Sequence, residues 1–305
     1  MVSIPSSWYF VCSSKELTRG KVIQRTLNGM SFVLFRNENN QPVVMKSRCI
    51  HLGADLKSAK IQNGNIICPL HQWTFNSEGD CIHAKMHEGN VPKLKQNVMQ
   101  SKEIFKSIFV FLGNQYFSFP ELNFANEFSF EPTPFVRLDT NWQSLASNSF
   151  DIEHLSVVHK RGLHKEPELK ILSPHIMFMS YESYVLSNEI SDKIMKFLSG
   201  NKIRVKVHNY GGTLLTIESQ LKKRKAVLVF SFVPENEEFI RIHTIVGVPK
   251  KFPLLDWIQR KISIYLYMSF LKRDFIAIRN LRVREENLES DQYLKIYSKY
   301  LKGLE

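Results

Sequence analysis

The stretch from residue 49 to residue 71 opens with Cys49-Ile50-His51 and closes, after sixteen intervening residues, with Cys68-Pro69-Leu70-His71. Each cysteine follows a strand-like apolar run, and Gly53 and Pro69 are residues that tight bends favour. We therefore expect both cysteine–histidine pairs at loop tips. Two thiolates and two imidazoles that meet there can hold a structural Zn²⁺, or a [2Fe-2S] cluster with two cysteines on one iron and two histidines on the other.

The order of the ligands favours the iron–sulfur cluster over zinc. Zinc modules more often pair like residues, in Cys-x-x-Cys and His-x₃₋₅-His arms. The two pairs in this chain are mixed, Cys-x-His and Cys-x-x-His. A structural zinc site is the alternative that the ligand types alone leave open.

The longer context of both arms resembles the Rieske iron–sulfur motif. Residues 49–56 read Cys-Ile-His-Leu-Gly-Ala-Asp-Leu and residues 68–75 read Cys-Pro-Leu-His-Gln-Trp-Thr-Phe. The resemblance implies that Cys49 and Cys68 bind the inner iron of a [2Fe-2S] cluster and that His51 and His71 bind the outer iron.

The motif differs from known Rieske sequences in two ways. Rieske proteins of respiratory complexes carry a disulfide between the loops, whereas Ala54 and Leu70 stand at the matching positions here, so the chain is similar to the oxygenase and ferredoxin branch. Leu70 and Gln72 also differ from the usual oxygenase pattern Cys-Pro-Tyr-His-Gly-Trp. We expect altered tuning of the cluster by the residues around it.

Length and composition allow a second domain. The chain has 305 residues, 43% of them apolar and 12% aromatic, which suffices for two cores. Short strand-like runs predict a small antiparallel β domain over residues 1–117; they cover residues 8–12, 21–27, 31–35, 43–46, 61–68 and 104–112. The Phe- and Pro-rich residues 117–134 predict the connection to a second domain, residues 118–305.

Other features exclude several classes of protein. No apolar run is long enough for a membrane span and no signal sequence is evident, so we expect a cytoplasmic protein. Cys12 and Cys81 are expected as unpaired core thiols.

The net charge of +12 is spread along the chain, and its densest tract, residues 222–225, predicts a solvated hairpin turn. No motif supports nucleic-acid binding, whereas a basic surface suits an acidic electron-donor protein.

A second chemical signal lies in residues 141–159, where Asp151, His154 and His159 form an Asp-x₂-His-x₄-His pattern. Two histidines and a carboxylate from elsewhere form the facial triad that binds non-haem Fe(II). On a regular helix His154 and His159 would lie about 140° apart. They can face one ion only at a helix end or at a bulge, which the pattern therefore predicts. Plain surface or core histidines are the alternative.

The whole segment resembles the iron-binding segment of Rieske non-haem iron oxygenases. The matching residues are Asn141, Trp142, Asn148, Asp151, His154 and His159. The resemblance implies that His154 and His159 are iron ligands and that Asn148 and Asp151 serve catalysis. Ser147 stands where the family often has an acidic residue.

The third iron ligand is expected on a helix predicted over residues 254–286. Asp274 lies there among apolar residues, where a carboxylate is costly unless it is paired or bound to a metal. The family has a similar Asp followed by aliphatic residues, so the resemblance assigns Asp274, although Leu281 replaces the family's usual Gln. An ion pair of Asp274 with Arg273 or Lys272 is the alternative.

Five further runs predict an antiparallel sheet in the second domain, at residues 183–190, 202–210, 213–221, 226–233 and 239–248. The expected fold class is α+β. An N-terminal all-β Rieske domain precedes a domain that the resemblance identifies as a helix-grip catalytic domain, with a curved sheet packed on a long C-terminal helix. A largely apolar cavity predicts a hydrophobic or aromatic small-molecule substrate.

The resemblance implies a terminal oxygenase that uses O₂ and a mononuclear Fe(II) to hydroxylate, demethylate or desaturate its substrate, with monooxygenation expected rather than dioxygenation. The chain has no Gly-x-Gly-x-x-Gly fingerprint, so electrons from NAD(P)H are expected through a separate reductase or ferredoxin. The resemblance also implies a head-to-tail homotrimer in which Asp151 bridges His154 and the partner subunit's His71. The competing function is an electron carrier or redox sensor that keeps the cluster and binds a ligand without oxygenation.

Overall fold

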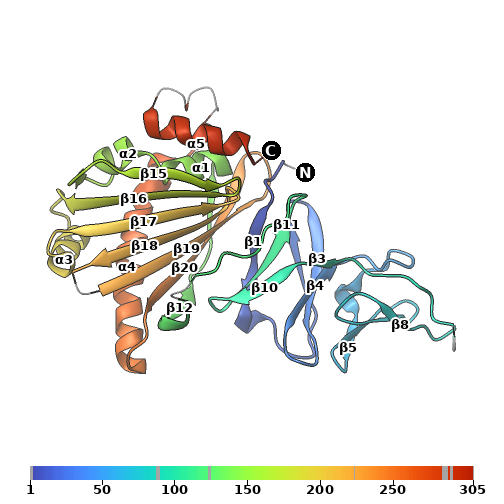
Figure 1. The fold of residues 1–305 in the computed structure, drawn as a ribbon. Coiled ribbons are helices and arrows are strands. Elements are labelled where there is room, and N and C mark those ends of the chain that lie inside the picture. The colour runs from blue at the N-terminus through green and yellow to red at the C-terminus, as the bar shows by residue number, and fades with distance from the viewer. Residues whose placement is uncertain are drawn as a thin grey trace. The chain divides into compact units, whose positions relative to one another are not determined.

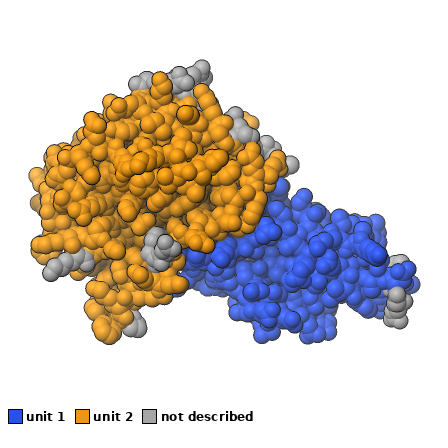
Figure 2. Space-filling model, viewed as in Figure 1, with its two compact units in different colours: residues 1, 9–112 blue, residues 2–8, 113–305 orange. Residues whose placement is uncertain are grey.

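A computed structural model describes residues 3–86, 90–122, 125–222, 224–283, 288 and 291–304 of the chain. The chain forms two compact units (Figure 2), Tyr9–Leu112 and a second one that joins Val2–Trp8 to Gly113–Glu305. The domain boundary expected between residues 117 and 118 stays a prediction.

The N-terminal unit consists of short antiparallel strands (Figure 1). They form one three-stranded sheet, β1-β11-β10, and two four-stranded sheets, β2-β3-β4-β9 and β5-β6-β7-β8. The bounds are β1 Ser7–Ser13, η1 Ser14–Glu16, β2 Ile23–Leu27, β3 Met30–Arg36, β4 Pro42–Lys46, η2 Leu56–Ser58, β5 Lys60–Gln62, β6 Asn65–Ile67, β7 Thr74–Phe75, β8 Cys81–His83, β9 Val98–Met99, β10 Ser101–Ile104 and β11 Ser107–Leu112. Four of the six strands predicted here are confirmed within two residues at each end.

The other two predicted strands of this unit are wrong, because each spans a hairpin. Residues 61–68 turn at Asn63 and Gly64, and residues 104–112 turn at Phe105 and Lys106. All four turn residues have a positive φ, which fits the two-residue turns whose twist matches that of the strands. Asn63-Gly64 is the usual sequence signal for such a turn, and a Cβ at Gly64 would overlap the backbone of Glu38.

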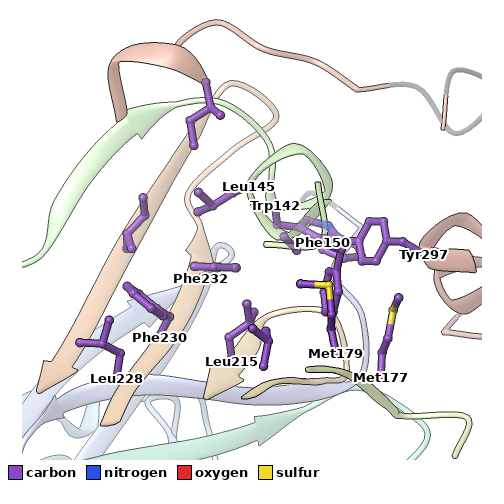
Figure 3. Close-up of a cluster of buried hydrophobic side chains, with 14 of the residues drawn as sticks. Trp142, Leu145, Phe150, Met177, Met179, Leu215, Leu228, Phe230, Phe232 and Tyr297 are labelled. Atoms are coloured by element: carbon purple, nitrogen blue, oxygen red, sulfur yellow. The ribbon is translucent and has the colours of Figure 1, made fainter. Parts of the chain in front are cut away.

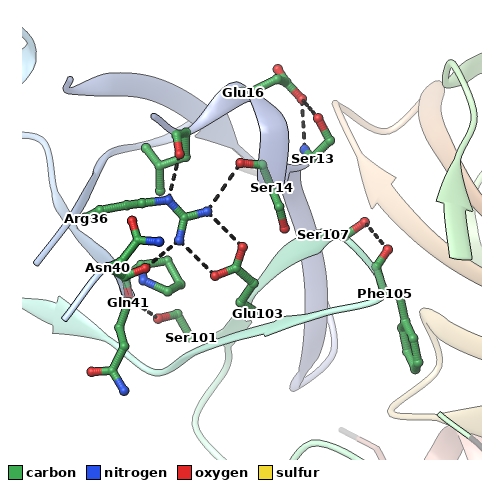
Figure 4. Close-up of polar contacts among 12 residues, drawn as sticks. Ser13, Ser14, Glu16, Arg36, Asn40, Gln41, Ser101, Glu103, Phe105 and Ser107 are labelled. Atoms are coloured by element: carbon green, nitrogen blue, oxygen red, sulfur yellow. Dashed lines mark hydrogen bonds and ion pairs between the residues drawn. The ribbon is translucent and has the colours of Figure 1, made fainter. Parts of the chain in front are cut away.

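A buried arginine joins separate parts of the N-terminal unit (Figure 4). Arg36 in β3 donates two hydrogen bonds, 2.8 and 2.9 Å long, to the carboxylate of Glu103 in β10. It also donates to the carbonyls of Leu17 and Asn40, each at 2.7 Å. These bonds compensate the burial of the Arg36 side chain, which is 8% exposed. The hydrogen bond from Arg36 holds the pKa of Glu103 below its ordinary value.

The C-terminal unit is a nine-stranded antiparallel sheet with helices packed on it, and the α+β fold class is confirmed. The strand order is β12-β20-β19-β18-β17-β16-β14, with β13 paired to β20 and β15 paired to β16. The bounds are η3 Ala125–Glu127, β12 Phe128–Pro132, β13 Val136–Asp139, α1 Trp142–Asn148, α2 Ile152–Val157, β14 Arg161–Leu163, β15 Glu168–Ser173, β16 Ile176–Val185, α3 Ile190–Ser199, β17 Ile203–Tyr210, β18 Leu214–Leu221, β19 Arg224–Pro234, β20 Phe239–Pro249, α4 Pro253–Ala277 and α5 Gln292–Lys302.

The core of this unit lies between the sheet and its helices. Figure 3 shows side chains of β16, β18 and β19 converging with those of α1 and α5. Alternate residues of a strand share one face, so Phe230 and Phe232 of β19 both enter this core, as do Met177 and Met179 of β16. The long helix α4 contacts β20 and adds Leu271 to the same cluster.

Four of the five strands predicted in this unit are confirmed within two residues, and the fifth is wrong. The strand expected over residues 183–190 is β16, which lies earlier because it pairs with β17 from Ile176 to Ser183. Residue 190 instead begins α3. The helix expected over residues 254–286 is α4, but it ends at Ala277. Residues 284–286 of that prediction lie outside the described part of the chain.

Three smaller predictions can be compared with the structure. Lys222 lies in a turn and Arg224 begins β19, as a hairpin requires, while residue 223 lies outside the described residues. Neither Cys12 nor Cys81 forms a disulfide. Cys12 is buried, as predicted, whereas Cys81 lies on the edge strand β8, is only partly buried and packs against the core of its unit. No described helix is long and apolar enough to cross a membrane, and the cytoplasmic location stays a prediction.

Candidate metal centres and the adjoining cavity

The first cysteine–histidine loop closes on its own backbone. The Cys49 N–H donates to the Ala54 carbonyl at 2.9 Å, and the Gly53 N–H donates to the Cys49 carbonyl at 2.8 Å. Gly53 has a φ of 72°, in the left-handed region that glycine adopts without strain. This closure places Cys49 and His51 on one tight loop, as expected from Gly53.

A distant glutamine holds the same loop and was not anticipated from the sequence. Gln96 is 1% exposed, and its Oε1 accepts a hydrogen bond of 2.8 Å from the Ile50 N–H. Its Nε2 donates to the carbonyls of Lys46 and Arg48 at 2.8 and 2.9 Å. Gln96 therefore supports the backbone between the two ligands of the first loop. No local sequence signal identifies it, because it follows Ile50 by 46 residues.

The second loop has the same closure. The Cys68 N–H donates to the Trp73 carbonyl at 2.8 Å, and the Gln72 N–H donates to the Cys68 carbonyl at 3.0 Å. Gln72 has a φ of 58°, which costs a residue with a Cβ about 1–2 kcal/mol. The loop thus keeps the backbone shape of a motif that usually has glycine at this position.

The two loops bring like side chains together. The Cys49 and Cys68 side chains lie in one buried cluster, and the ring centroids of His51 and His71 lie 4.9 Å apart. Burial raises the pKa of Cys49 to about 11, and the neighbouring Cys68 thiol adds to the rise, while backbone N–H groups of His51 and Leu52 oppose it. Cysteine beside cysteine and histidine beside histidine is the division of ligands that a Rieske cluster requires.

An unsatisfied nitrogen supports the fit to a cluster. His51 Nδ1 is buried and has no hydrogen-bond partner among the described residues. The Trp73 ring stacks on the His51 ring at 3.8 Å with 6° between their planes, which fixes its orientation. A metal ion would satisfy this nitrogen and would ionise the two buried thiols. The residues present therefore fit a [2Fe-2S] cluster.

The second donor set lies in the C-terminal unit. His154 Nε2 and His159 Nε2 lie 2.7 and 2.8 Å from Asp274 Oδ1, and 3.2 Å from each other. Helix α2 ends at Val157, so His159 lies beyond it, and the predicted helix end is confirmed. The three side chains are at most 10% exposed. Two imidazoles and one carboxylate at this separation fit the facial triad of a non-haem iron site.

The electrostatics of this site favour metal-binding protonation states. Burial acts to raise the pKa of Asp274, but hydrogen bonds with His154 and His159 outweigh it, so the pKa lies below its ordinary value. Burial lowers the pKa of His159. An ionised carboxylate and a neutral imidazole are the forms that bind a cation. The ion pair of Asp274 with Arg273 does not form, because Arg273 pairs with Glu189 and Asp192.

Two neighbours orient the triad. Asn148 Nδ2 donates to Asp274 Oδ1 at 2.8 Å, which places this predicted residue directly beside the donor set. The Phe270 ring stacks on His159 at 3.5 Å, with 3° between the planes. Phe270 was not anticipated, although it precedes Asp274 by four residues and therefore shares its face of α4.

Asp151 has a structural role that the sequence pattern did not reveal. It is the N-cap of α2, and its Oδ1 accepts a hydrogen bond of 2.8 Å from the His154 N–H. An aspartate N-cap is worth about 1 kcal/mol. The cap occupies one carboxylate oxygen, and a part in a bridge between subunits stays a prediction.

A cavity of about 150 Å³ adjoins the triad. His154, His159 and Asp274 line it together with Asn148 and Asp151. Most of the remaining lining is apolar and comes from the sheet and α4, with Met179, Val205, Leu228, Phe230 and Leu266 as examples. The metal site therefore opens into a hydrophobic space.

Comparisons with known sequences identify the N-terminal part of the chain and its relatives. The family model of the Rieske [2Fe-2S] domain matches residues 7–97. The aminopyrrolnitrin oxygenase of Pseudomonas fluorescens is 28% identical over 202 residues, which are 60% of this chain and 53% of that protein. The cholesterol 7-desaturase of Drosophila melanogaster is 22% identical over 332 aligned positions, 96% of this chain and 77% of that protein. The chain spans about half the length of the first of these relatives.

Solved structures share the whole fold. The crystal structure of dicamba monooxygenase bound to dicamba has a TM-score of 0.72 and 16% sequence identity, covering 100% of this chain and 98% of that one. The fold and the two donor sets define a protein with a Rieske-type [2Fe-2S] domain and a second site, His154, His159 and Asp274, that fits a mononuclear non-haem iron. Residues 7–97 form a Rieske [2Fe-2S] domain, and the chain is similar in sequence and in fold to proteins named as oxygenases.

Proposed function

We propose that this protein is the oxygenase component of a multi-protein system that uses O₂ to oxidise a hydrophobic small molecule. The observation that carries the proposal is the apolar cavity beside His154, His159 and Asp274. Bound there, an Fe(II) ion would supply the oxygen chemistry, and a cluster on the N-terminal loops would supply electrons. The chain's own residues give the cavity its apolar lining and hold the donor atoms in place.

We propose monooxygenation, demethylation or desaturation as the reaction, and electrons from NAD(P)H through a separate reductase or ferredoxin. The relatives support an O₂-dependent oxidation. They do not distinguish monooxygenation from dioxygenation, because a 3-chlorobenzoate-3,4-dioxygenase oxygenase subunit of Comamonas testosteroni is also similar to this chain. One of the similar solved structures is a carbazole dioxygenase oxygenase in complex with a ferredoxin. That complex supports a small electron-carrying protein as the partner.

The test begins with anaerobically purified full-length protein, its iron and acid-labile sulfide quantified and its EPR spectrum recorded after reduction. About three irons per chain, two of them in a Rieske-type cluster, are expected. The loaded protein is then combined with a ferredoxin and its reductase, isotopically labelled O₂ and a panel of apolar substrates. Labelled product, or desaturated product with matching O₂ uptake, supports the proposal. A cluster with two irons and no triad-bound iron after reconstitution would favour an electron carrier or redox sensor, and zinc in place of iron would exclude both functions.

We also propose that the subunits form a head-to-tail homotrimer in which Asp151 links His154 to the partner subunit's His71. Mixed oligomers test this arrangement. A His71→Ala chain lacking a functional cluster is combined with a His154→Ala chain lacking the mononuclear iron, after reversible dissociation. Recovered activity is expected if electrons cross between subunits. Activity that never exceeds that of the separate variants would contradict the arrangement.

The structure sharpens the choice of variant at Asp151. Asp151→Ala removes the α2 cap as well as the charge, so slower turnover would not identify a bridge. Asn caps helices as well as Asp does, so Asp151→Asn keeps the bond to the His154 N–H and removes only the carboxylate. We expect Asp151→Asn to retain both metals and its melting temperature but to slow reduction of the mononuclear iron at least tenfold, measured in single turnover. Full activity would remove the bridge hypothesis.

A further inference from the structure

The cavity has a second polar region besides the metal triad. Arg161 and Tyr181 line the same cavity as His154, His159 and Asp274. They come from β14 and β16, which are neighbouring strands of the large sheet. Most of the remaining cavity wall is apolar, and its other polar residues include serines together with Asp192 and Arg273.

The guanidinium of Arg161 is incompletely satisfied. Its side chain is 5% exposed, and Nη2 lies 3.1 Å from Asp192 Oδ1. Nη1 is buried and has no hydrogen-bond partner in the part of the chain that the structure describes. A buried donor without an acceptor is unfavourable by about 1–3 kcal/mol. Because Nη1 itself has almost no accessible surface, a molecule in the cavity recovers this free energy when the Arg161 side chain turns this nitrogen toward an acceptor.

The charges around Arg161 balance. Asp192 accepts from Arg161 and also from Arg273, at 2.6 Å, and Arg273 pairs further with Glu189 at 2.7 Å. Two arginines therefore face two carboxylates. Because no positive charge is left over, this group has little to offset the desolvation of an anion. The expected acceptor is a neutral oxygen.

The hydroxyl of Tyr181 provides the second donor. It has no hydrogen bond to any described residue. Burial raises the pKa of Tyr181 well above its ordinary value, the Arg161 guanidinium opposes the rise and the Asp274 carboxylate adds to it. Tyr181 therefore stays a protonated donor and lies within electrostatic reach of both Arg161 and the triad.

We propose that Arg161 and Tyr181 form the specificity subsite of the cavity and bind a neutral oxygen acceptor, a ketone, amide or hydroxyl oxygen, of an otherwise apolar substrate. A molecule held by this oxygen presents carbon atoms to the triad in one orientation. The consequence for orientation rests on the proposed oxygenase function, whereas recognition of the oxygen does not.

Binding to three probes with the same ring tests the proposal without turnover. Acetonaphthone carries a neutral carbonyl, ethylnaphthalene lacks it, and naphthoate carries an anionic carboxylate. Affinities for the iron-loaded full-length protein are measured by calorimetry under anaerobic conditions. One recovered hydrogen bond predicts that acetonaphthone binds about tenfold more tightly than ethylnaphthalene, and naphthoate is expected to bind more weakly than acetonaphthone.

Tyr181→Phe is the primary variant, because it removes a hydroxyl that no described residue uses and should not disturb the fold. Arg161→Lys keeps a positive charge for Asp192. Lysine has a single side-chain nitrogen, so it lacks the second guanidinium nitrogen that would donate to the bound oxygen. Both variants should reduce the preference for acetonaphthone to less than threefold while ethylnaphthalene binds as in the wild type. Tyr184→Phe is the matched control, since Tyr184 lies on the same strand but does not line the cavity, and it should keep the full preference.

The possible results separate this inference from the proposed function. Equal binding of acetonaphthone and ethylnaphthalene to the wild type, a preference that survives in Tyr181→Phe and Arg161→Lys, or tightest binding of naphthoate would each overturn the subsite. A cavity that binds none of the three probes would overturn it as well. Selective ketone binding by a protein that never consumes O₂ would refute the oxygenase function and leave the subsite standing.

Discussion

Replacing Gln96 by leucine should loosen the loop that carries Cys49 and His51. The substitution keeps the volume of the side chain but deletes three buried hydrogen bonds, to the Ile50 N–H and to the carbonyls of Lys46 and Arg48. At about 1 kcal/mol for each bond, the N-terminal unit should lose about 3 kcal/mol of stability. Gln41→Leu is the control, because Gln41 is exposed and its side chain accepts a single long bond of 3.3 Å; its effect should stay within about 0.5 kcal/mol.

Two measurements check this magnitude. Urea unfolding of the N-terminal unit is followed by the visible absorbance of the bound cluster, and the rate of cluster loss is measured in the presence of an iron chelator. If loop opening limits the loss, 3 kcal/mol corresponds to a rate about a hundredfold higher in Gln96→Leu. Stability within about 1 kcal/mol of the wild type, with an unchanged rate of cluster loss, would refute the role assigned to Gln96.

Three further substitutions have defined outcomes. Asp274→Asn should remove the mononuclear iron and leave the cluster, so iron falls from about three to about two per chain at constant acid-labile sulfide; constant iron would exclude Asp274 as a ligand. Gln72→Gly should stabilise the second loop by about 1 kcal/mol in thermal unfolding, and more than Asn63→Gly, since Asn tolerates a positive φ. The folded-state pKa of Glu103 is lowered by Arg36, so this pair stabilises the protein above the ordinary pKa near 4.5 and the stabilisation is lost as the pH falls through the folded-state value. Glu103→Gln should therefore cost roughly 2 kcal/mol at neutral pH, a difference from wild type that shrinks on acidification; a difference independent of pH would contradict the ion pair.

The features predictable from the sequence are those encoded locally. Alternating apolar residues located most strands, and the spacing of His154 and His159 implied the helix end that the structure contains at Val157. The failures also have local causes. The strand predicted over residues 61–68 includes the Asn63-Gly64 turn, although that pair is a turn signal. The Phe105-Lys106 turn contains no residue that is typical of turns.

The parts of the site that sequence reasoning missed come from distant segments. Gln96 contacts Ile50 only because β9 pairs with β4. Phe270 had a usable signal, its position one helical turn before Asp274, but its stacking on His159 depends on how α4 packs. Arg161 follows His159 by two residues, yet its unsatisfied nitrogen becomes apparent only when Asp192 of α3 is placed beside it.

The two centres depend on their metals to different degrees. In the second site Asp274 accepts hydrogen bonds involving both histidines and Asn148, so the atoms that face one another are satisfied. Of the buried side-chain atoms of this triad, only His159 Nδ1, on the far side of its ring, has no partner among the described residues. In the first site His51 Nδ1 has no partner among the described residues, and two thiols lie buried side by side. A group left buried and unsatisfied lowers stability, so binding of the cluster contributes more to folding of its unit than binding of iron does to folding of the other.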